Sequence, residues 1–111
     1  MATDNEKYRL PPMSGRQKKH LRALGHHLHP VVYVGKEGIT QTVLTAIDEA
    51  ITAHELIKVK LGQNCPLAKK EAAGELARQS GTVLAQLIGK TVLLYRHNPD
   101  LPSEKQIKLP T

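Results

Sequence analysis

Residues 31–40 read Val31-Val32-Tyr33-Val34-Gly35-Lys36-Glu37-Gly38-Ile39-Thr40. The first four are apolar and mostly β-branched, which predicts a buried strand with Tyr33 in the core. Two glycines three positions apart then predict a tight turn, because glycine adopts backbone conformations that other residues avoid. Thr40 is a candidate N-cap for a helix that follows. The stretch therefore predicts a strand, a Gly-x-x-Gly turn and a helix, in that order.

A Gly-x-x-Gly turn between a strand and a helix is suited to binding phosphate. Its backbone N–H groups lie at the positive end of the helix dipole, and glycine has no side chain to block an approaching anion. The motif is weak alone, because two such glycines more often mark only a tight turn. It lacks the Gly-x4-Gly-Lys-Ser/Thr spacing of a nucleotide P-loop, so ATP or GTP hydrolysis has no support.

The segment before the strand predicts a helix with one apolar and one basic side. Ser14 is a candidate N-cap. Leu21, Leu24 and Leu28 recur at helical spacing, and the helix is expected to end near His27. The opposite side and its flank carry the basic residues Arg16, Lys18, Lys19, Arg22 and His26. Ordinary surface helices carry acidic residues among the basic ones, but this helix contains no acidic residue. We therefore expect positive charge to be concentrated beside the glycine turn.

Residues 40–54 predict a second helix, because aliphatic side chains recur there every four residues. Residues 57–61 alternate three aliphatics with Lys58 and Lys60, which predicts a strand with one apolar and one basic side. One face of the sheet is therefore expected to be open and basic.

The C-terminal half of the chain predicts a third helix and a hairpin. Pro66 suits the first turn of this helix, and Gly81 suits the position after its last turn. Strand-like runs at residues 82–88 and 91–96 are separated by Gly89-Lys90, a two-residue connection typical of a hairpin with glycine first.

The predicted order is helix, strand, helix, strand, helix, strand, strand, which indicates an α/β fold of the two-layer, α+β-like kind. Strand–helix–strand units imply parallel crossovers, and the hairpin adds antiparallel pairing. We expect a small mixed four-stranded sheet with helices packed mainly on one face. Prolines near both ends predict a flexible leader at residues 1–13, a domain at 14–96 and a tail at 97–111.

Composition favours an anionic partner. The 111 residues include 16 Lys and Arg against 10 Asp and Glu, a net charge of +6. No apolar stretch approaches the ~18 residues of a membrane-spanning helix, and residues 1–12 lack the apolar centre of a signal peptide. We therefore expect a cytoplasmic protein without a membrane partner. The single cysteine, Cys65, excludes an intramolecular disulfide.

Neither a metal site nor an active site is predicted. His26 and His27 diverge by about 100° on a helix, and no acidic residue close in sequence completes a site. Asp48 and Glu49 are adjacent on a helix and also diverge, so they do not form the paired carboxylates that acid–base catalysis uses. We expect no enzyme activity and no cofactor.

Nucleic acid is the partner that the cations favour. Candidate contacts to the sugar–phosphate backbone are Gly35, Lys36, Glu37 and Gly38 in the turn, Arg16, Lys18, Lys19 and Arg22 in the first helix, and Lys58, Lys60, Lys90 and Arg96 on the sheet or its edge. Three tyrosines without Phe or Trp make no stacking platform like that of an RRM. Recognition through backbone and shape is expected, as for structured RNA.

Five stretches of the sequence occur together in a characteristic order. They are Gln17-Lys18-Lys19-His20-Leu21-Arg22-Ala23-Leu24, His29-Pro30-Val31-Val32, Val34-Gly35-Lys36-Glu37-Gly38-Ile39-Thr40, His54-Glu55-Leu56-Ile57-Lys58-Val59-Lys60 and Ile88-Gly89-Lys90-Thr91-Val92-Leu93-Leu94-Tyr95-Arg96. Together they resemble the YhbY-type, stand-alone bacterial CRM domain (chloroplast RNA splicing and ribosome maturation) over residues 14–96. The end Ile107-Lys108-Leu109-Pro110 is also similar to that family.

The resemblance implies a fold similar to the C-terminal domain of a bacterial translation initiation factor, and a loop at residues 35–38 with a role like that of the KH-domain loop. It also implies association with precursor large ribosomal subunits through ribosomal RNA. We therefore expect a monomeric, non-enzymatic RNA-binding protein of large-subunit assembly. The alternative is an adaptor whose basic first helix docks on an acidic protein, in a complex that survives nuclease and high salt.

Overall fold

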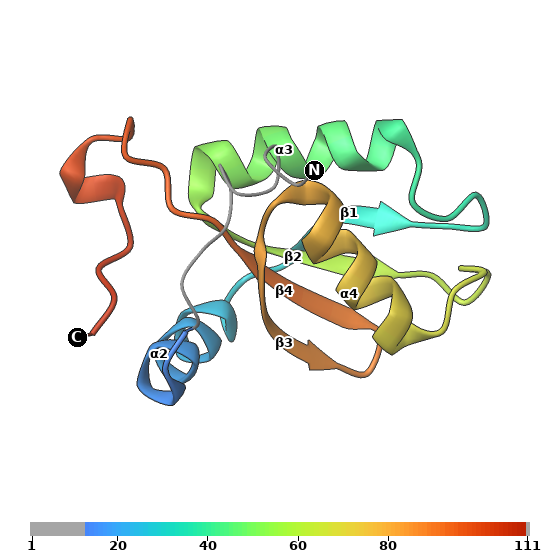
Figure 1. Ribbon diagram of the computed structural model, residues 1–111, viewed down its shortest axis with the longest axis horizontal. Helices are drawn as coiled ribbons and strands as arrows, with labels where there is room; N and C mark the ends of the chain where they lie inside the picture. The colour runs from blue at the N-terminus through green and yellow to red at the C-terminus, as the bar shows by residue number, and fades with distance from the viewer. Residues whose placement is uncertain (1–12, 111) are drawn as a thin grey trace, which may run out of the picture.

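The computed structural model describes residues 13–110, so residues 1–12 of the predicted leader lie outside the described part of the chain. Figure 1 shows the helices and strands in the predicted order. They are α2 (Gly15–Gly25), β1 (Pro30–Val34), α3 (Gln41–His54), β2 (Leu56–Leu61), α4 (Lys69–Ser80), β3 (Val83–Ile88) and β4 (Thr91–Tyr95), followed by the short 3-10 helix η1 (Ser103–Lys105).

The sheet is mixed, and its strands lie in the order β1-β2-β4-β3. β1 and β2 are parallel, with α3 as the crossover between them, whereas β4 is antiparallel to both β2 and β3. Gly89 has a φ of 56° at the first position of the β3–β4 turn. Glycine adopts this left-handed conformation without strain, which explains its place in a two-residue hairpin connection. The predicted mixed sheet and hairpin are confirmed.

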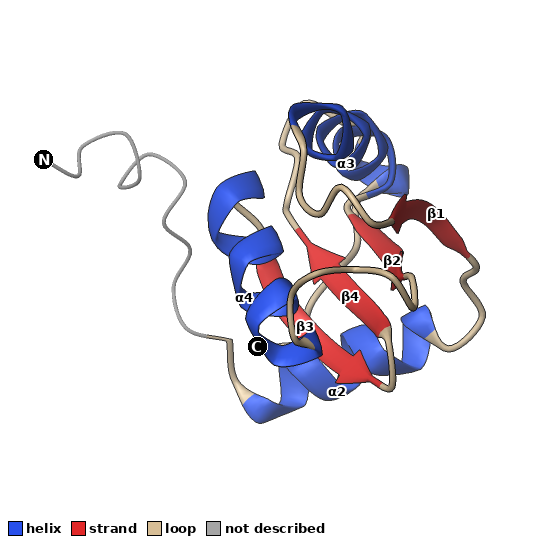
Figure 2. Ribbon diagram, turned by 90° about the vertical axis from the view of Figure 1, so that its right-hand side faces the viewer, coloured by secondary structure: helices blue, strands red, loops and turns tan. Residues whose placement is uncertain are grey.

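Two helices cover one face of the sheet, and the third packs across part of the other (Figure 2). α3 and α4 bury the larger core, in which Ile47 and Leu76 are completely buried. α2 packs on β3, β2 and β4 from the opposite side and buries a smaller core around Leu21 and Leu93. The expectation that the helices lie mainly on one face holds for two of the three, and part of the second face stays uncovered.

Strand β2 shows how alternation divides the two faces. Ile57, Val59 and Leu61 lie in the larger core with at most 2% of their surface exposed. Lys58 and Lys60 project from the opposite face, where Lys60 is exposed. The predicted strand with one apolar and one basic side is confirmed.

Both predicted N-caps are present. The Ser14 Oγ accepts a hydrogen bond from the Gln17 N–H at 3.1 Å, and the Gln17 Oε1 accepts one from the Ser14 N–H at 3.1 Å, which makes a capping box at the start of α2. The Thr40 Oγ1 accepts a hydrogen bond from the Val43 N–H at 3.1 Å at the start of α3. Each side chain satisfies a helix N–H group that would otherwise lack an acceptor.

The start of α4 differs from its prediction. The helix begins at Lys69, three residues after Pro66. Before Pro66 the chain makes a turn, in which the Cys65 N–H donates to the Gly62 carbonyl oxygen at 3.1 Å. Pro66 therefore belongs to the loop. The predicted end is confirmed, since Gly81 follows the last turn with a φ of 67°.

β1 is not the buried strand that its apolar run predicts. Val32 and Val34 are buried beneath α3, but Val31 is 59% exposed and Tyr33 is 62% exposed. β1 is an edge strand of the sheet, and α2 does not cover it. The side chains of β1 that point to the face on which α2 lies are therefore exposed to solvent. The prediction that Tyr33 lies in the core is wrong.

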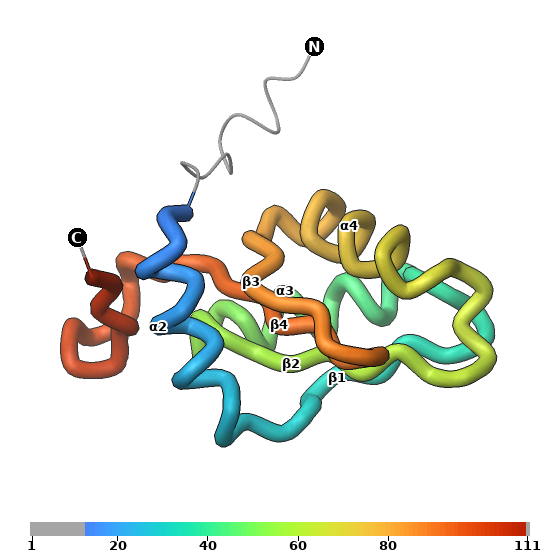
Figure 3. The backbone as a smooth tube through the Cα atoms, turned by 90° about the horizontal axis from the view of Figure 1, so that it is seen from below, coloured from blue at the N-terminus to red at the C-terminus, as the bar shows by residue number. Residues whose placement is uncertain are grey.

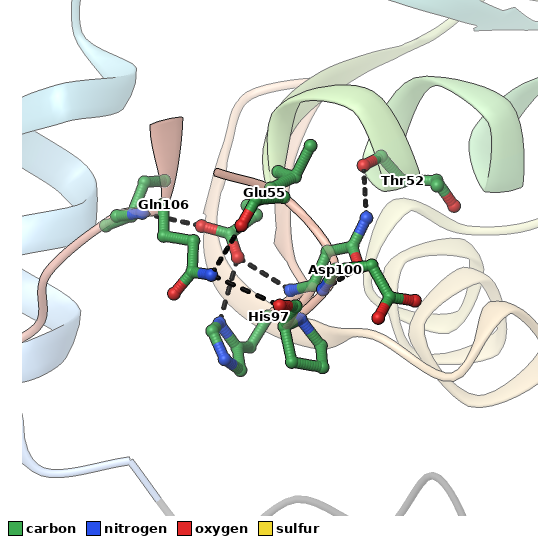
Figure 4. Close-up of polar contacts among 9 residues, drawn as sticks. Thr52, Glu55, His97, Asp100 and Gln106 are labelled. Carbon is green, nitrogen blue, oxygen red and sulfur yellow. Dashed lines mark hydrogen bonds and ion pairs between the residues drawn. The ribbon is translucent and has the colours of Figure 1, made fainter. Parts of the chain in front are cut away.

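A buried carboxylate fastens the C-terminal tail to the domain (Figure 4). Glu55 follows α3 with a φ of 64°, and its side chain is completely buried. Its Oε2 accepts the Asn98 N–H at 2.6 Å and lies 2.9 Å from the His97 Nδ1, while its Oε1 accepts the Ile107 N–H at 2.6 Å. Ile107 and Leu109 also pack on the smaller core. The tail is thus held across the end of α3 and beside α2.

Candidate functional site

The Gly-x-x-Gly turn connects β1 to α3 at one end of the sheet. The Gly38 N–H donates to the Gly35 carbonyl oxygen at 3.0 Å and closes a β-turn, with Lys36 and Glu37 exposed at its tip. Gly38 is buried with a φ of 75°, and a Cβ there would lie 3.3 Å from the Pro66 Cγ. The expectation that the N–H of Gly38 is open to an anion is wrong, because the turn itself uses it.

An anion at this turn would meet the Lys36 side chain and the positive end of the α3 dipole, since the helix begins at Gln41. The Thr40 Oγ1 already accepts a hydrogen bond from one of the first N–H groups of the helix, that of Val43. Glu37 brings one carboxylate to the tip of the turn and partly offsets the charge of its neighbour.

Lys60 and Lys90 lie at the same end of the sheet as the turn. The Gly62 N–H donates to the Val34 carbonyl oxygen at 2.8 Å, so the end of β2 adjoins the residue before the turn. The Leu61 N–H donates to the Lys90 carbonyl oxygen at 2.7 Å, which brings the β3–β4 turn to the same edge. Both lysines are exposed. The structure thus brings Lys36, Lys60 and Lys90 to one end of the molecule.

Four residues form a row across the uncovered face of the sheet, with one residue from each strand. They are Tyr33, Lys60, Thr91 and Ile88, each a register partner of the next. Register partners point to the same face, and we call this set the open row. Tyr33 and Ile88 are each 62% exposed. The four strands contain Lys58 and Lys60 but no Asp or Glu. The open row is therefore apolar and positive, and no strand places a carboxylate beside it.

The cations of α2 do not lie beside the turn. Figures 1 and 3 place α2 and the turn at opposite ends of the molecule. β1 leads from one to the other, and an extended strand separates its ends by about 3.3 Å for every residue. The prediction that the basic helix adjoins the turn is wrong. The two segments are close in sequence, but β1 lies between them and its extended backbone holds them apart.

The contacts of Gln17 and Leu21 fix how α2 is turned on the sheet. The Gln17 Nε2 donates to the Pro110 carbonyl oxygen at 3.1 Å, so the Gln17 flank faces the tail. Leu21 packs in the smaller core, and Lys18 and Arg22 lie on the flank of the helix opposite Gln17. The remaining candidates on this helix, Arg16 and Lys19, are on its outward side.

Arg96 is not part of this surface. Its Nη2 pairs with the Asp48 carboxylate at 2.8 Å and donates to the Thr52 Oγ1 at 3.0 Å, while its Nη1 donates to the Ser80 carbonyl oxygen at 3.0 Å. Only 19% of its side chain is exposed. Arg96 joins the end of β4 to α3 and α4, so its role is structural.

Sequence analysis missed Tyr33 and Ile88 as surface residues. All four residues of the run 31–34 are apolar, which hides the period of two that would mark an exposed side. β1 is an edge strand beside β2, and nothing in the run itself marks this position.

His26 and His27 lie at the C-terminal end of α2. His26 and His27 are exposed, and their rings meet edge to face at 5.2 Å. Across residues 13–110, no cluster of three or more His, Cys, Asp or Glu side chains is placed to bind a metal ion. In the same range, every helix is too short or too polar to cross a membrane.

Comparison with known proteins gives consistent matches. The model of the CRS1 / YhbY (CRM) domain family matches residues 13–96. The "Probable RNA-binding protein YqeI" of Bacillus subtilis (strain 168) is 42% identical over 98 residues, which are 88% of this chain and 99% of that protein. The "RNA-binding protein" of Haemophilus influenzae is 39% identical over 102 residues, covering 91% and 98% of the two chains.

A solved structure matches the fold as well. The solution structure of the hypothetical protein SAV1595 from Staphylococcus aureus has a TM-score of 0.73 and 35% identity, covering 89% of this chain and 100% of that one. The fold and the sequence matches therefore agree over nearly the whole of the described chain. This chain belongs to the CRS1 / YhbY (CRM) domain family.

Proposed function

We propose that this protein binds RNA across the uncovered face of its sheet and the adjoining Gly-x-x-Gly turn. The open row carries the proposal, because it crosses all four strands, includes Lys60 and has no carboxylate on any strand. Clustered lysines bind RNA by neutralising phosphates and releasing counterions. The names of the relatives in Bacillus subtilis and Haemophilus influenzae, "Probable RNA-binding protein YqeI" and "RNA-binding protein", support the same function.

The lysines have separate places in this proposal. Lys36, Lys60 and Lys90 contact phosphates at the turn end, and Lys58 continues the surface toward α2. Lys18 and Arg22 supply a second contact for a longer RNA. Phosphate contacts fix where the RNA lies without reading its sequence. The protein therefore recognises the backbone and shape of RNA, and Gly35, Glu37 and Gly38 shape the turn that presents Lys36.

The RNA that we propose is ribosomal RNA of the precursor large subunit. The resemblance to the YhbY-type CRM domain supports this target. We propose a cytoplasmic monomer that holds or chaperones RNA during assembly. No catalytic step is proposed, since binding and release of RNA are sufficient for that role.

Crosslinking in cells, followed by sequencing of the attached RNA, tests the proposal. Reads are expected to cluster in large-subunit ribosomal RNA and its precursors, and to be lost in a Lys60→Glu, Lys90→Glu double variant. Both side chains are exposed, so the variant is expected to fold. Reads spread over cellular RNA would contradict the ribosomal target. Undiminished crosslinking by the variant would contradict the surface.

The exposed side chains of Val31 and Ile88 favour a second candidate function, that of an adaptor that docks on an acidic protein. Apolar side chains within a charged surface are typical of protein interfaces. The adaptor predicts a partner complex that resists ribonuclease and high salt, whereas the RNA proposal predicts that ribonuclease disperses the complex. Pull-down with and without ribonuclease separates the two.

A further inference from the structure

The aromatic ring of Tyr33 is exposed yet closely packed on the backbone. The residue is 62% exposed. A Cβ at Gly62 would lie 2.6 Å from the tyrosine Cζ, and one at Gly35 would lie 3.4 Å from its Cε2. The ring therefore leans along β1 toward the turn and occupies the space above a residue without a side chain. A flat aromatic surface therefore faces solvent at the end of the open row that lies nearest the turn.

Cations accompany this ring. Lys60 is the register partner of Tyr33 on β2, and Lys36 lies at the tip of the turn toward which the ring leans. The nearest acid in sequence is Glu37, on the turn rather than on the sheet. A flat apolar ring beside cations matches the two parts of a nucleotide, since a base stacks on an aromatic face and its phosphate binds lysine.

We infer that Tyr33 is a stacking surface for one unpaired base of the bound RNA, next to phosphates held by Lys36 and Lys60. The inference rests on the proposed function and specifies its partner: a hairpin loop, a bulge or a single-stranded junction, not an uninterrupted duplex. Bases inside an A-form duplex stack on one another and are not available to a side chain, whereas unpaired bases are.

Two RNA probes and three variants test the inference. The probes are an RNA hairpin with an unpaired adenine-rich loop and a blunt RNA duplex of the same stem sequence. Tyr33→Leu removes the ring and keeps apolar bulk, Tyr33→Phe keeps the ring, and Val31→Ala removes a side chain of similar exposure, 59%, from the same strand. Affinities come from fluorescence anisotropy at one fixed salt concentration, with thermal melting as the check on folding.

Tyr33→Leu is expected to weaken hairpin binding by about 5-fold or more, the lower limit for losing one stacked base. Tyr33→Phe and Val31→Ala are expected to stay close to the wild type, and duplex binding is expected to be unchanged in all three. Tyr33→Trp adds the only tryptophan of the chain, whose fluorescence the hairpin, but not the duplex, is expected to quench.

The outcomes separate the inference from the function on which it rests. Wild-type affinity of Tyr33→Leu for the hairpin, or no quenching in Tyr33→Trp, would overturn stacking while leaving RNA binding in place. Equal losses on both probes would also overturn it, because stacking on an unpaired base cannot weaken duplex binding. A wild type that binds neither probe would overturn the proposed function, and the inference with it.

Discussion

The phenol ring of Tyr33 lies over Gly62, in the space that a side chain at residue 62 would fill. A Gly62→Ala variant would place its Cβ 2.6 Å from the tyrosine Cζ, so the ring must move. The ring is exposed and can swing into solvent, so we expect little change in melting temperature. Affinity for a looped RNA is expected to fall as far as in Tyr33→Leu. Wild-type affinity in a variant that folds normally would show that the position of the ring does not matter for binding.

The two glycines of the turn are predicted to differ. Gly38→Ala is expected to destabilise the protein by about 1 kcal/mol or more, because alanine is strained at a φ of 75°. Gly35→Ala places its Cβ 3.4 Å from the Tyr33 Cε2, an ordinary contact, and its effect should be smaller. Urea unfolding of both variants measures the difference. Equal stabilities would mean that the turn does not require glycine at residue 38.

Glu55 is predicted to hold the tail in place. Glu55→Ala leaves the N–H groups of Asn98 and Ile107 without their acceptor, which is expected to cost about 2–4 kcal/mol of unfolding free energy. Hydrogen exchange should show loss of protection from residue 98 onward. The matched control is Glu75→Ala, whose carboxylate pairs with Arg78 at 2.7 Å on the surface and should change stability little. Retained protection in Glu55→Ala would contradict this role.

We predict that the ionisation of Tyr95 makes the unfolding free energy fall at alkaline pH. Burial, and then the nearby charge of Glu55, raise the pKa of Tyr95 from 10.0 to about 12. The unfolded chain therefore releases this proton at lower pH than the folded one. The stabilisation is complete below pH 10 and is lost as the pH rises toward 12. The unfolding free energy of the wild type, relative to that of Tyr95→Phe, should therefore fall over this interval. A constant difference would contradict the shift.

Much of the fold could be predicted, because its signals are local. Ser14 and Thr40 are side chains that cap helices, Gly89 suits the hairpin turn, and alternation of Lys58 and Lys60 with aliphatics sets the two sides of β2. In each case the interaction that fixes the structure lies within a few residues of the sequence pattern, so the pattern is sufficient to predict that structure.

The errors have a different physical origin. Arg96 pairs with a residue 48 positions away, and Glu55 accepts hydrogen bonds from a segment 43 to 52 positions later, so no local pattern marks either role. Whether Tyr33 is buried depends on where α2 packs on the sheet. The lysines and the turn of the candidate site can be named from residue types alone, and their role in RNA binding stays a prediction. The distance of α2 from the turn and the exposed ring of Tyr33 cannot be found in this way.

The salt dependence of RNA affinity tests the central claim most directly. The logarithm of the binding constant is measured against the logarithm of salt concentration for wild type, for Lys60→Ala with Lys90→Ala, and for Lys105→Ala with Lys108→Ala. The second pair has the same charge loss and is exposed on the tail. The account predicts a slope shallower by about 1 to 2 units for the first pair and a wild-type slope for the second. Equal slopes for the two pairs would contradict RNA binding at the open row.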